Sequence, residues 1–163
     1  KNFFTTFDVN QFITPQKSNQ MNTSNQTPYH LFCFVYLGFA QLSNKDFIEK
    51  EIDEIQKKIA IWMNLNPSNI IEFNKIMDET INWYQSIKEN ERLESVLEIA
   101  RSMNAIESFT LENKKTFLSD IRDIAVADGR FNSDEKHLHD RIAKELGINM
   151  MTIDKNTRKK LGY

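Results

Sequence analysis

The residue types best suited to chemistry in this chain lie in one acidic segment, Ile124 to Glu135. Asp128-Gly129 is typical of the end of a helix. Asn132, followed three residues later by Glu135, has the pattern of a capping box at the start of the next helix. The spacing therefore predicts a tight helix–loop–helix corner across which Asp128 and Glu135 face each other. Acidic residues in such a corner cap helices or, in a calcium-binding loop, supply oxygen ligands to the ion.

An EF-hand calcium loop is one alternative for this corner. Gly129 and Glu135 have the spacing of its invariant glycine and its bidentate glutamate. The first half of the loop does not fit, because Ile124 and Val126 stand where aspartate or asparagine is needed. The segment offers about three oxygens, whereas calcium takes six to eight. Tight calcium binding is therefore not expected, whereas Asp128 and Glu135 can each cap a helix end, a contribution of about 1 kcal/mol each.

The other reactive residues give little support for catalysis. Cys33 is the only cysteine, which excludes an internal disulfide, a cysteine-rich zinc site and a dithiol redox pair. It lies in an apolar stretch, so a buried, unreactive thiol is expected. Glu135 and His139 have a spacing that can chelate a transition metal, but they supply only two ligands. Because no serine elbow, metalloprotease motif or glycine-rich phosphate loop occurs, we expect a protein that is not an enzyme.

The charge balance argues against a nucleic-acid partner. The chain has 21 basic and 23 acidic residues, a net charge of −2. Residues 28–143 hold 14 Lys/Arg against 20 Asp/Glu, and the basic excess in the last twenty residues is short. Nucleic-acid binders need a basic face. The longest apolar run, Leu31 to Ala40, is too short for a membrane span, which needs about 20 residues. We expect a cytoplasmic protein with no transmembrane segment.

Helical periodicity supplies the elements that must position the acidic corner. The four glycines, three prolines and few valines argue against a sandwich or barrel of short strands. The predicted fold is all-α, a compact bundle of six to seven helices. One apolar stripe at helical spacing consists of Ile48, Ile52, Ile55, Ile59 and Trp62. Four of the expected helices span 28–42, 90–104, 111–127 and 132–146. Two more follow caps, one from the cap at 43–46 to residue 62 and one from the cap at 66–67 to residue 84. A short seventh helix is expected within 148–161.

Residues 1–26 differ in composition from the helical domain expected over 28–163. From Thr14 to Thr27 the sequence is mainly Asn, Gln, Ser and Thr, which is typical of a linker or polar arm. The first thirteen residues include four phenylalanines, which are costly to leave in water. We expect this N-terminal arm to dock on the domain or on a second copy, so self-association or a protein partner is one functional hypothesis.

The residues around the corner also resemble a known family. The segments that carry the resemblance are Ala127-Asp128-Gly129, Phe131, Glu135, Leu138, Ile142 and Leu146-Gly147-Ile148. Together they are similar to the signature of the tellurite-resistance TerB-like family. The resemblance implies an all-helical domain built from two helix–loop–helix units, of which the first lies near residues 32–62 and the second contains the corner.

The resemblance also implies which residues take part in a site. In the first unit Glu51 matches Glu135, and Gln41-Leu42 replaces Asp-Gly. In this family the paired acidic motifs are proposed to form a metal-ion site, with a role in the tellurite and chemical-stress response. The metal ligands carried over in this way are Asp128, Glu135 and Glu51, with Asp46 as a weaker candidate nearby.

Two functions from different classes are therefore predicted. The first is a non-enzymatic TerB-like module of the tellurite and chemical-stress response that binds a divalent metal ion weakly at these carboxylates. The alternative is a protein–protein interaction or oligomerisation scaffold in which the acidic residues are purely structural helix caps. The distance between Glu51 and Glu135 bears on the choice, because carboxylates within about 6 Å disfavour each other's ionised form unless a cation is present.

Overall fold

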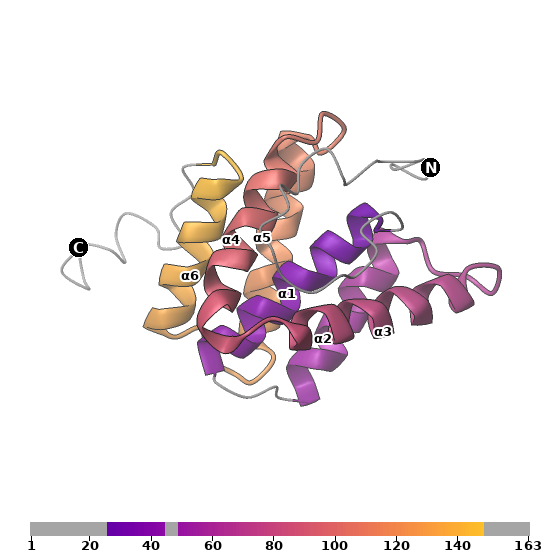
Figure 1. Cartoon of the computed structure of the whole chain (residues 1–163), viewed down its shortest axis with the longest axis horizontal. Coiled ribbons are helices and arrows are strands. Elements are labelled where there is room, and N and C mark those ends of the chain that lie inside the picture. The colour runs from indigo at the N-terminus through magenta and orange to yellow at the C-terminus, as the bar shows by residue number, and fades with distance from the viewer. Residues whose placement is uncertain (1–25, 45–48, 149–163) are drawn as a thin grey trace.

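A central helix surrounded by five others makes up the fold (Figure 1). The computed structural model describes residues 26–44 and 49–148, which hold six helices and no strand. The predicted all-α bundle is confirmed. The predicted arm and seventh helix lie outside the described residues, except at Gln26 and Ile148. The helices are α1 (Pro28–Asn44), α2 (Glu49–Trp62), α3 (Ile70–Ser86), α4 (Glu89–Asn104), α5 (Leu111–Val126) and α6 (Ser133–Glu145).

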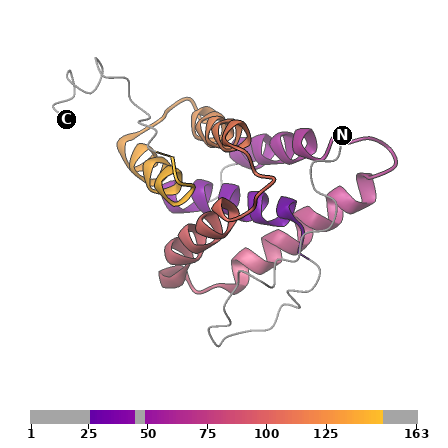
Figure 2. The ribbon, with the colours of Figure 1, turned by 90° about the horizontal axis from the view of Figure 1, so that it is seen from above.

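Helix α1 is central because its sequence is apolar on almost every side. Every residue from Pro28 to Ala40 is buried. The helix packs against each of the other five, and in Figure 2 it runs between α2 and α5 on one side and α3 and α4 on the other. A helix without a polar face is stable in water only when it is surrounded in this way.

The outer helices are amphipathic, as their periodicity predicts. In α2, Ile55 and Ile59 are fully buried, while Ile52 and Trp62 are partly buried against the core. This confirms the predicted stripe over the residues that the structure describes. Most of the stabilisation of such a helix comes from burying this apolar face rather than from helix propensity.

The capping patterns in the sequence predict the start of α6 correctly but place the start of α3 too early. Asn132 and Glu135 form the predicted capping box at α6. The pattern also predicts a helix start at Asn66-Pro67, whereas α3 begins at Ile70. The reason is that Asn66 forms a turn of its own, in which its side-chain oxygen accepts a hydrogen bond from the Ser68 backbone N–H at 2.9 Å.

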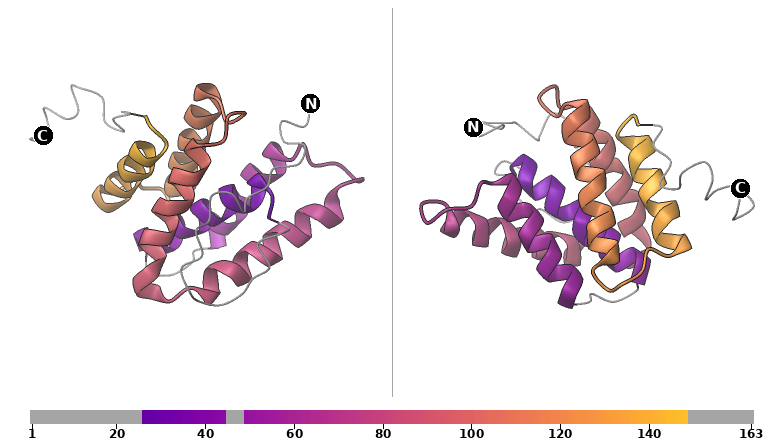
Figure 3. Two further views of the ribbon diagram at one scale, coloured as in Figure 1. Left: turned by 45° about the horizontal axis from the view of Figure 1, so that its top comes forward. Right: turned by 180° about the vertical axis from the view of Figure 1, so that it is seen from behind.

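The arrangement of α2, α5 and α6 positions the candidate site. Helix α5 packs against both α2 and α6. In Figure 1 and in the right-hand view of Figure 3, the start of α2 lies beside the loop that joins α5 to α6. Two segments that are far apart in the sequence, the start of α2 and the α5–α6 loop, therefore meet at one end of the bundle.

Helices α1 and α4 cross closely at Gly38, where there is no room for a Cβ atom. Adding one carbon atom there should therefore lower the stability of the fold. A Cβ at this position would lie 2.2 Å from Cγ2 of Val96 and 3.3 Å from Cε2 of Tyr84. We expect Gly38→Ala to lower the free energy of unfolding by about 1–3 kcal/mol through overpacking, although alanine favours helices by about 1 kcal/mol. Urea unfolding measures this change.

The control is a double-mutant cycle with Val96→Ala, which removes the clashing atom. The cost of Gly38→Ala should be smaller in the Val96→Ala background than in the wild type. Equal costs in both backgrounds would show that the contact with Val96 does not require the glycine.

Candidate metal centre

The corner between α5 and α6 has the geometry that the sequence predicts. Gly129 turns the chain with a φ of 97°, a left-handed conformation that glycine adopts without steric cost. The backbone N–H of Asn132 donates to Oε2 of Glu135 at 2.7 Å, and the N–H of Glu135 donates to Oδ1 of Asn132 at 2.9 Å. Asp128 accepts a hydrogen bond from the Arg130 N–H at 3.0 Å. Local hydrogen bonds therefore fix both acidic side chains of the corner.

Glu51 reaches the same place from the other hairpin. It is the third residue of α2, as Glu135 is the third residue of α6. The side chain of a residue in the first turn of a helix points back toward the N-terminal end of that helix, because helical side chains tilt toward the N-terminus. The two glutamates therefore occupy equivalent positions in their helices, which agrees with the matching of two helix–loop–helix units.

The three predicted carboxylates lie together. One ligand oxygen from each of Glu51, Asp128 and Glu135 lies within 4.8 Å of the other two. Glu51 and Glu135 are fully buried, and Asp128 is exposed. All three donors are hard oxygens, and the group has an open side at Asp128, so its chemistry fits a divalent cation that keeps part of its water shell.

Gathering three carboxylates is unfavourable without a balancing positive charge. Like charges a few ångströms apart disfavour each other's ionised forms, and burial adds a desolvation cost. The positive ends of the α2 and α6 dipoles lie close to Glu51 and Glu135 and offset part of this cost. Each dipole end is equivalent to about half an elementary charge.

One detail of the predicted alignment is wrong. Gln41-Leu42 does not replace the Asp-Gly turn, because α1 continues through Asn44. Gln41 accepts a hydrogen bond from the Tyr84 hydroxyl at 2.6 Å inside the helical region. The first corner therefore starts later than the alignment predicts, and the weaker candidate Asp46 lies outside the described residues.

His139 belongs to a different environment. Its Nε2 lies 3.1 Å from the carbonyl oxygen of Leu118, so this nitrogen carries the hydrogen and donates it. Nδ1 lies 3.5 Å from Oδ1 of Asp140, and the ring packs edge-on against Phe131. Both ring nitrogens thus face residues outside the acidic cluster. Burial lowers the pKa of His139, although the Leu118 carbonyl and Asp140 act in the opposite direction.

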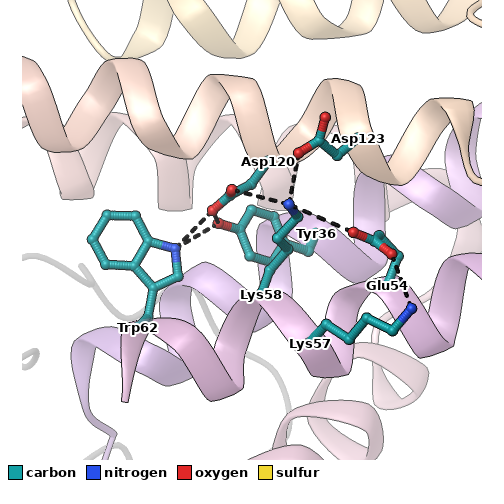
Figure 4. A network of polar contacts seen from close by, with 7 residues as sticks. All are labelled: Tyr36, Glu54, Lys57, Lys58, Trp62, Asp120 and Asp123. Carbon is teal, nitrogen blue, oxygen red and sulfur yellow. Dashed lines mark hydrogen bonds and ion pairs between the residues drawn. The ribbon is translucent and has the colours of Figure 1, made fainter. Parts of the chain in front are cut away.

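A second polar cluster lies on the same α2–α5 seam, and the sequence reasoning missed it. Figure 4 shows Lys58 and Trp62 of α2 reaching Asp120 and Asp123 of α5, with Tyr36 of α1 beneath them. The signal that could have found it is Asp120, a carboxylate on the apolar face of α5. A buried carboxylate needs donors, and its neighbours supply them.

The only thiol is unsuited to reaction, as expected. Cys33 is fully buried, and its Sγ contacts Sδ of Met77 at 3.7 Å. Burial raises the pKa of Cys33 to about 12, so the reactive thiolate is scarce at neutral pH.

None of the helices in the described ranges is both long enough and apolar enough to cross a membrane.

Comparison with protein-family models identifies the family of the chain. A family model described as "Tellurite resistance protein TerB" matches residues 43–156, well over half of the chain. The matched segment includes all three carboxylates of the cluster. Searches of curated proteins and of solved structures each gave no significant match.

The buried imidazole of His139 predicts a loss of stability in mild acid. Because its pKa is lowered on folding, the folded chain binds fewer protons than the unfolded chain. Its contribution is fully present above the ordinary histidine pKa of about 6.5 and is lost as the pH falls below that value. We expect the free energy of unfolding to fall by up to about 1.4 kcal/mol per pH unit for this proton. Urea unfolding between pH 7.5 and 5 measures the slope.

Two variants isolate this contribution. His139→Leu should make the slope shallower, whereas His137→Leu, on the exposed face of the same helix, controls for the loss of a histidine from α6. An unchanged slope in His139→Leu would assign the acid sensitivity to other groups, among them His30, whose pKa burial also lowers.

Proposed function

We propose that this chain, which belongs to the TerB family of tellurite resistance proteins, is a non-enzymatic module of the tellurite and chemical-stress response that binds a divalent cation at Glu51, Asp128 and Glu135. The observation that carries the proposal is the convergence of these three carboxylates within 4.8 Å, from two hairpins far apart in the sequence. Two of them are buried, so a cation there would be exposed to water mainly on the side of Asp128.

The donor set indicates which cations to expect. Three carboxylate oxygens, with no cysteine or histidine in the cluster, favour calcium, magnesium or manganese over softer metals. Three protein ligands leave half or more of the coordination shell to water. We therefore expect weak and reversible binding, of the kind suited to sensing a cation rather than to storing it.

The chemistry of the cluster also argues against direct action on tellurite. Tellurite is an oxyanion, and three carboxylates repel an anion unless a metal lies between them. Reduction of tellurite needs accessible electrons, and the Cys33 thiol is buried. A role in the stress response therefore fits cation binding or partner recruitment better than turnover of the oxyanion.

A second candidate function is an interaction or oligomerisation scaffold in which the acidic residues only cap helices. Its support is the complete capping box of Asn132 and Glu135, together with two exposed isoleucines, Ile61 and Ile71, with exposed fractions of 73% and 82%. For this candidate, deletion of residues 1–26 should change the oligomeric state, which analytical ultracentrifugation gives as the ratio of the particle mass to the mass of one chain. A monomer both before and after deletion would count against self-association.

The metal site predicts binding that depends on each carboxylate. Isothermal titration of the wild type with Ca²⁺, Mg²⁺, Mn²⁺ and Zn²⁺ should give heat for at least one of the first three. At a concentration of about 100 times Kd, that cation should stabilise the fold by about 2.7 kcal/mol. Glu51→Gln and Glu135→Gln should abolish both effects, because each removes a charge but keeps an oxygen that can cap the helix.

The matched control is Asp134→Asn. Asp134 is exposed and lies in the first turn of α6 beside Glu135, outside the cluster of three. It should bind the cation as the wild type does. Wild-type protein that gives no heat and no stabilisation with any of the four cations would refute the metal site and leave the capping function.

A further inference from the structure

We infer that Lys58 is a positioning residue for the acidic cluster, and that it fixes the register of α2 along α5 so that Glu51 arrives at Asp128 and Glu135. The inference rests on the proposed cation site and names the residue on which its geometry depends. It comes from the contacts of the second polar cluster, which lies two helical turns from Glu51 on the same helix.

Lys58 is held by carboxylates on two helices. Its Nζ lies 2.6 Å from Oδ2 of Asp123 and 3.7 Å from Oδ1 of Asp120, both on α5, and 3.5 Å from Oε1 of Glu54 on α2 (Figure 4). Only 14% of the side chain is exposed. Burial lowers the pKa of Lys58, but the hydrogen bond to Asp123 and the neighbouring negative charges outweigh it and raise the pKa. The ammonium group is therefore charged and confined.

A second contact between α2 and α5 lies one turn further along, at an oxygen that also binds α1. Nε1 of Trp62 donates to Oδ2 of Asp120 at 2.8 Å, and the Tyr36 hydroxyl donates to the same oxygen at 2.7 Å. From Trp62 to Lys58 on α2, the partner moves from Asp120 to Asp123 on α5. The two helices are therefore antiparallel, and the polar contacts advance along the seam by about one turn each.

The same register leads to the acidic cluster. Because the helices are antiparallel, the path along α2 from Lys58 back to Glu51 runs beside the path along α5 from Asp123 to its C-terminal end. Beyond that end, at Val126, the chain continues to Asp128. A shift of α2 by a single residue would move Glu51 by about 1.5 Å. Metal–oxygen distances for calcium are about 2.3–2.6 Å, so a shift of this size would take Glu51 out of the ligand sphere.

Directional contacts add to apolar packing in fixing this register. Ile55 and Ile59, the inward residues of α2, are fully buried, but the hydrophobic effect that favours their burial is itself non-directional. Charged hydrogen bonds are directional and lose strength quickly with distance. Lys58 joins the two helices at a point from which α2 extends as a rigid rod to Glu51.

Lys58→Met tests the inference, because two explanations predict changes of opposite sign. Loss of a positive charge about 10 Å from a cation site would by itself tighten cation binding slightly. Loss of the register would weaken it, by about tenfold for a supporting residue of a metal site. We expect Lys58→Met to weaken Ca²⁺ or Mn²⁺ binding about tenfold in isothermal titration, and Lys58→Arg to retain wild-type affinity.

Lys57→Met is the matched control. Lys57 is the neighbouring residue on α2, its side chain is 69% exposed, and its ion pair with Glu54 at 3.6 Å stays within the same helix. This variant has the same charge change and should bind the cation as well as the wild type or slightly better. The Glu51→Gln/Lys58→Met double variant reveals any cation that binds at the vacated lysine position, so this binding can be subtracted.

A metal-free measurement separates this inference from the proposed function. In a Glu51→Cys/Asp128→Cys background, disulfide formation with oxidised glutathione reports how often the two positions meet, and buried Cys33 does not compete. Adding Lys58→Met should slow disulfide formation about tenfold, whereas adding Lys57→Met should leave it unchanged.

The outcomes are distinct. Equal rates of disulfide formation with and without Lys58, or cation binding as tight in Lys58→Met as in Lys57→Met, would overturn the positioning role. If the wild type binds no cation, the proposed function is refuted, and slower disulfide formation on adding Lys58→Met still supports the positioning role.

Discussion

The packing of this bundle depends on one buried carboxylate, that of Asp120. Its Oδ2 accepts hydrogen bonds from Tyr36 of α1 and Trp62 of α2, so three helices meet at a single oxygen. Burial raises the pKa of Asp120, while these donors and Lys58 act in the opposite direction. A buried charge that loses a donor is strongly destabilising. Apolar packing brings α1, α2 and α5 together, and this directional contact helps to select one arrangement of the three helices.

The helices could be predicted from the sequence because their signals are local. The stripe through Ile55 and Ile59 and the capping pattern of Asn132 and Glu135 depend on residues within a few turns of one another. Helix α1 is apolar on almost every side, a local pattern that is typical of a central helix. The choice of neighbours could not be predicted, because it depends on shape. The contact between Gly38 and Val96 joins residues with no pattern in common, and only the assembled helices reveal it.

In the candidate site, too, the residues that belong to short-range patterns could be predicted and the others could not. Asp128 and Glu135 follow from a turn and a capping box, both of which are short-range patterns. Glu51 lies far away in the sequence, and only the resemblance to a family with two helix–loop–helix units pointed to it. Lys58 and Asp120 were missed, because neither belongs to a recognised motif. Asp120 nevertheless stands on the apolar face of α5 next to Ile121, and a carboxylate in such a place requires donors from another element.

Capping and cation binding are compatible functions of the same glutamates. An ionised carboxylate offers about four acceptor positions on two oxygens, and the cap at Asn132 uses only one of those of Glu135. A residue pattern for capping therefore cannot separate the two functions. The convergence of the three carboxylates favours the proposed cation site, because a capping side chain needs only the backbone of its own helix. Neither α2 nor α6 gains a better cap from having Glu51, Asp128 and Glu135 within 4.8 Å of one another. A cation bound there, as proposed above, would offset repulsion among these carboxylates and stabilise the fold.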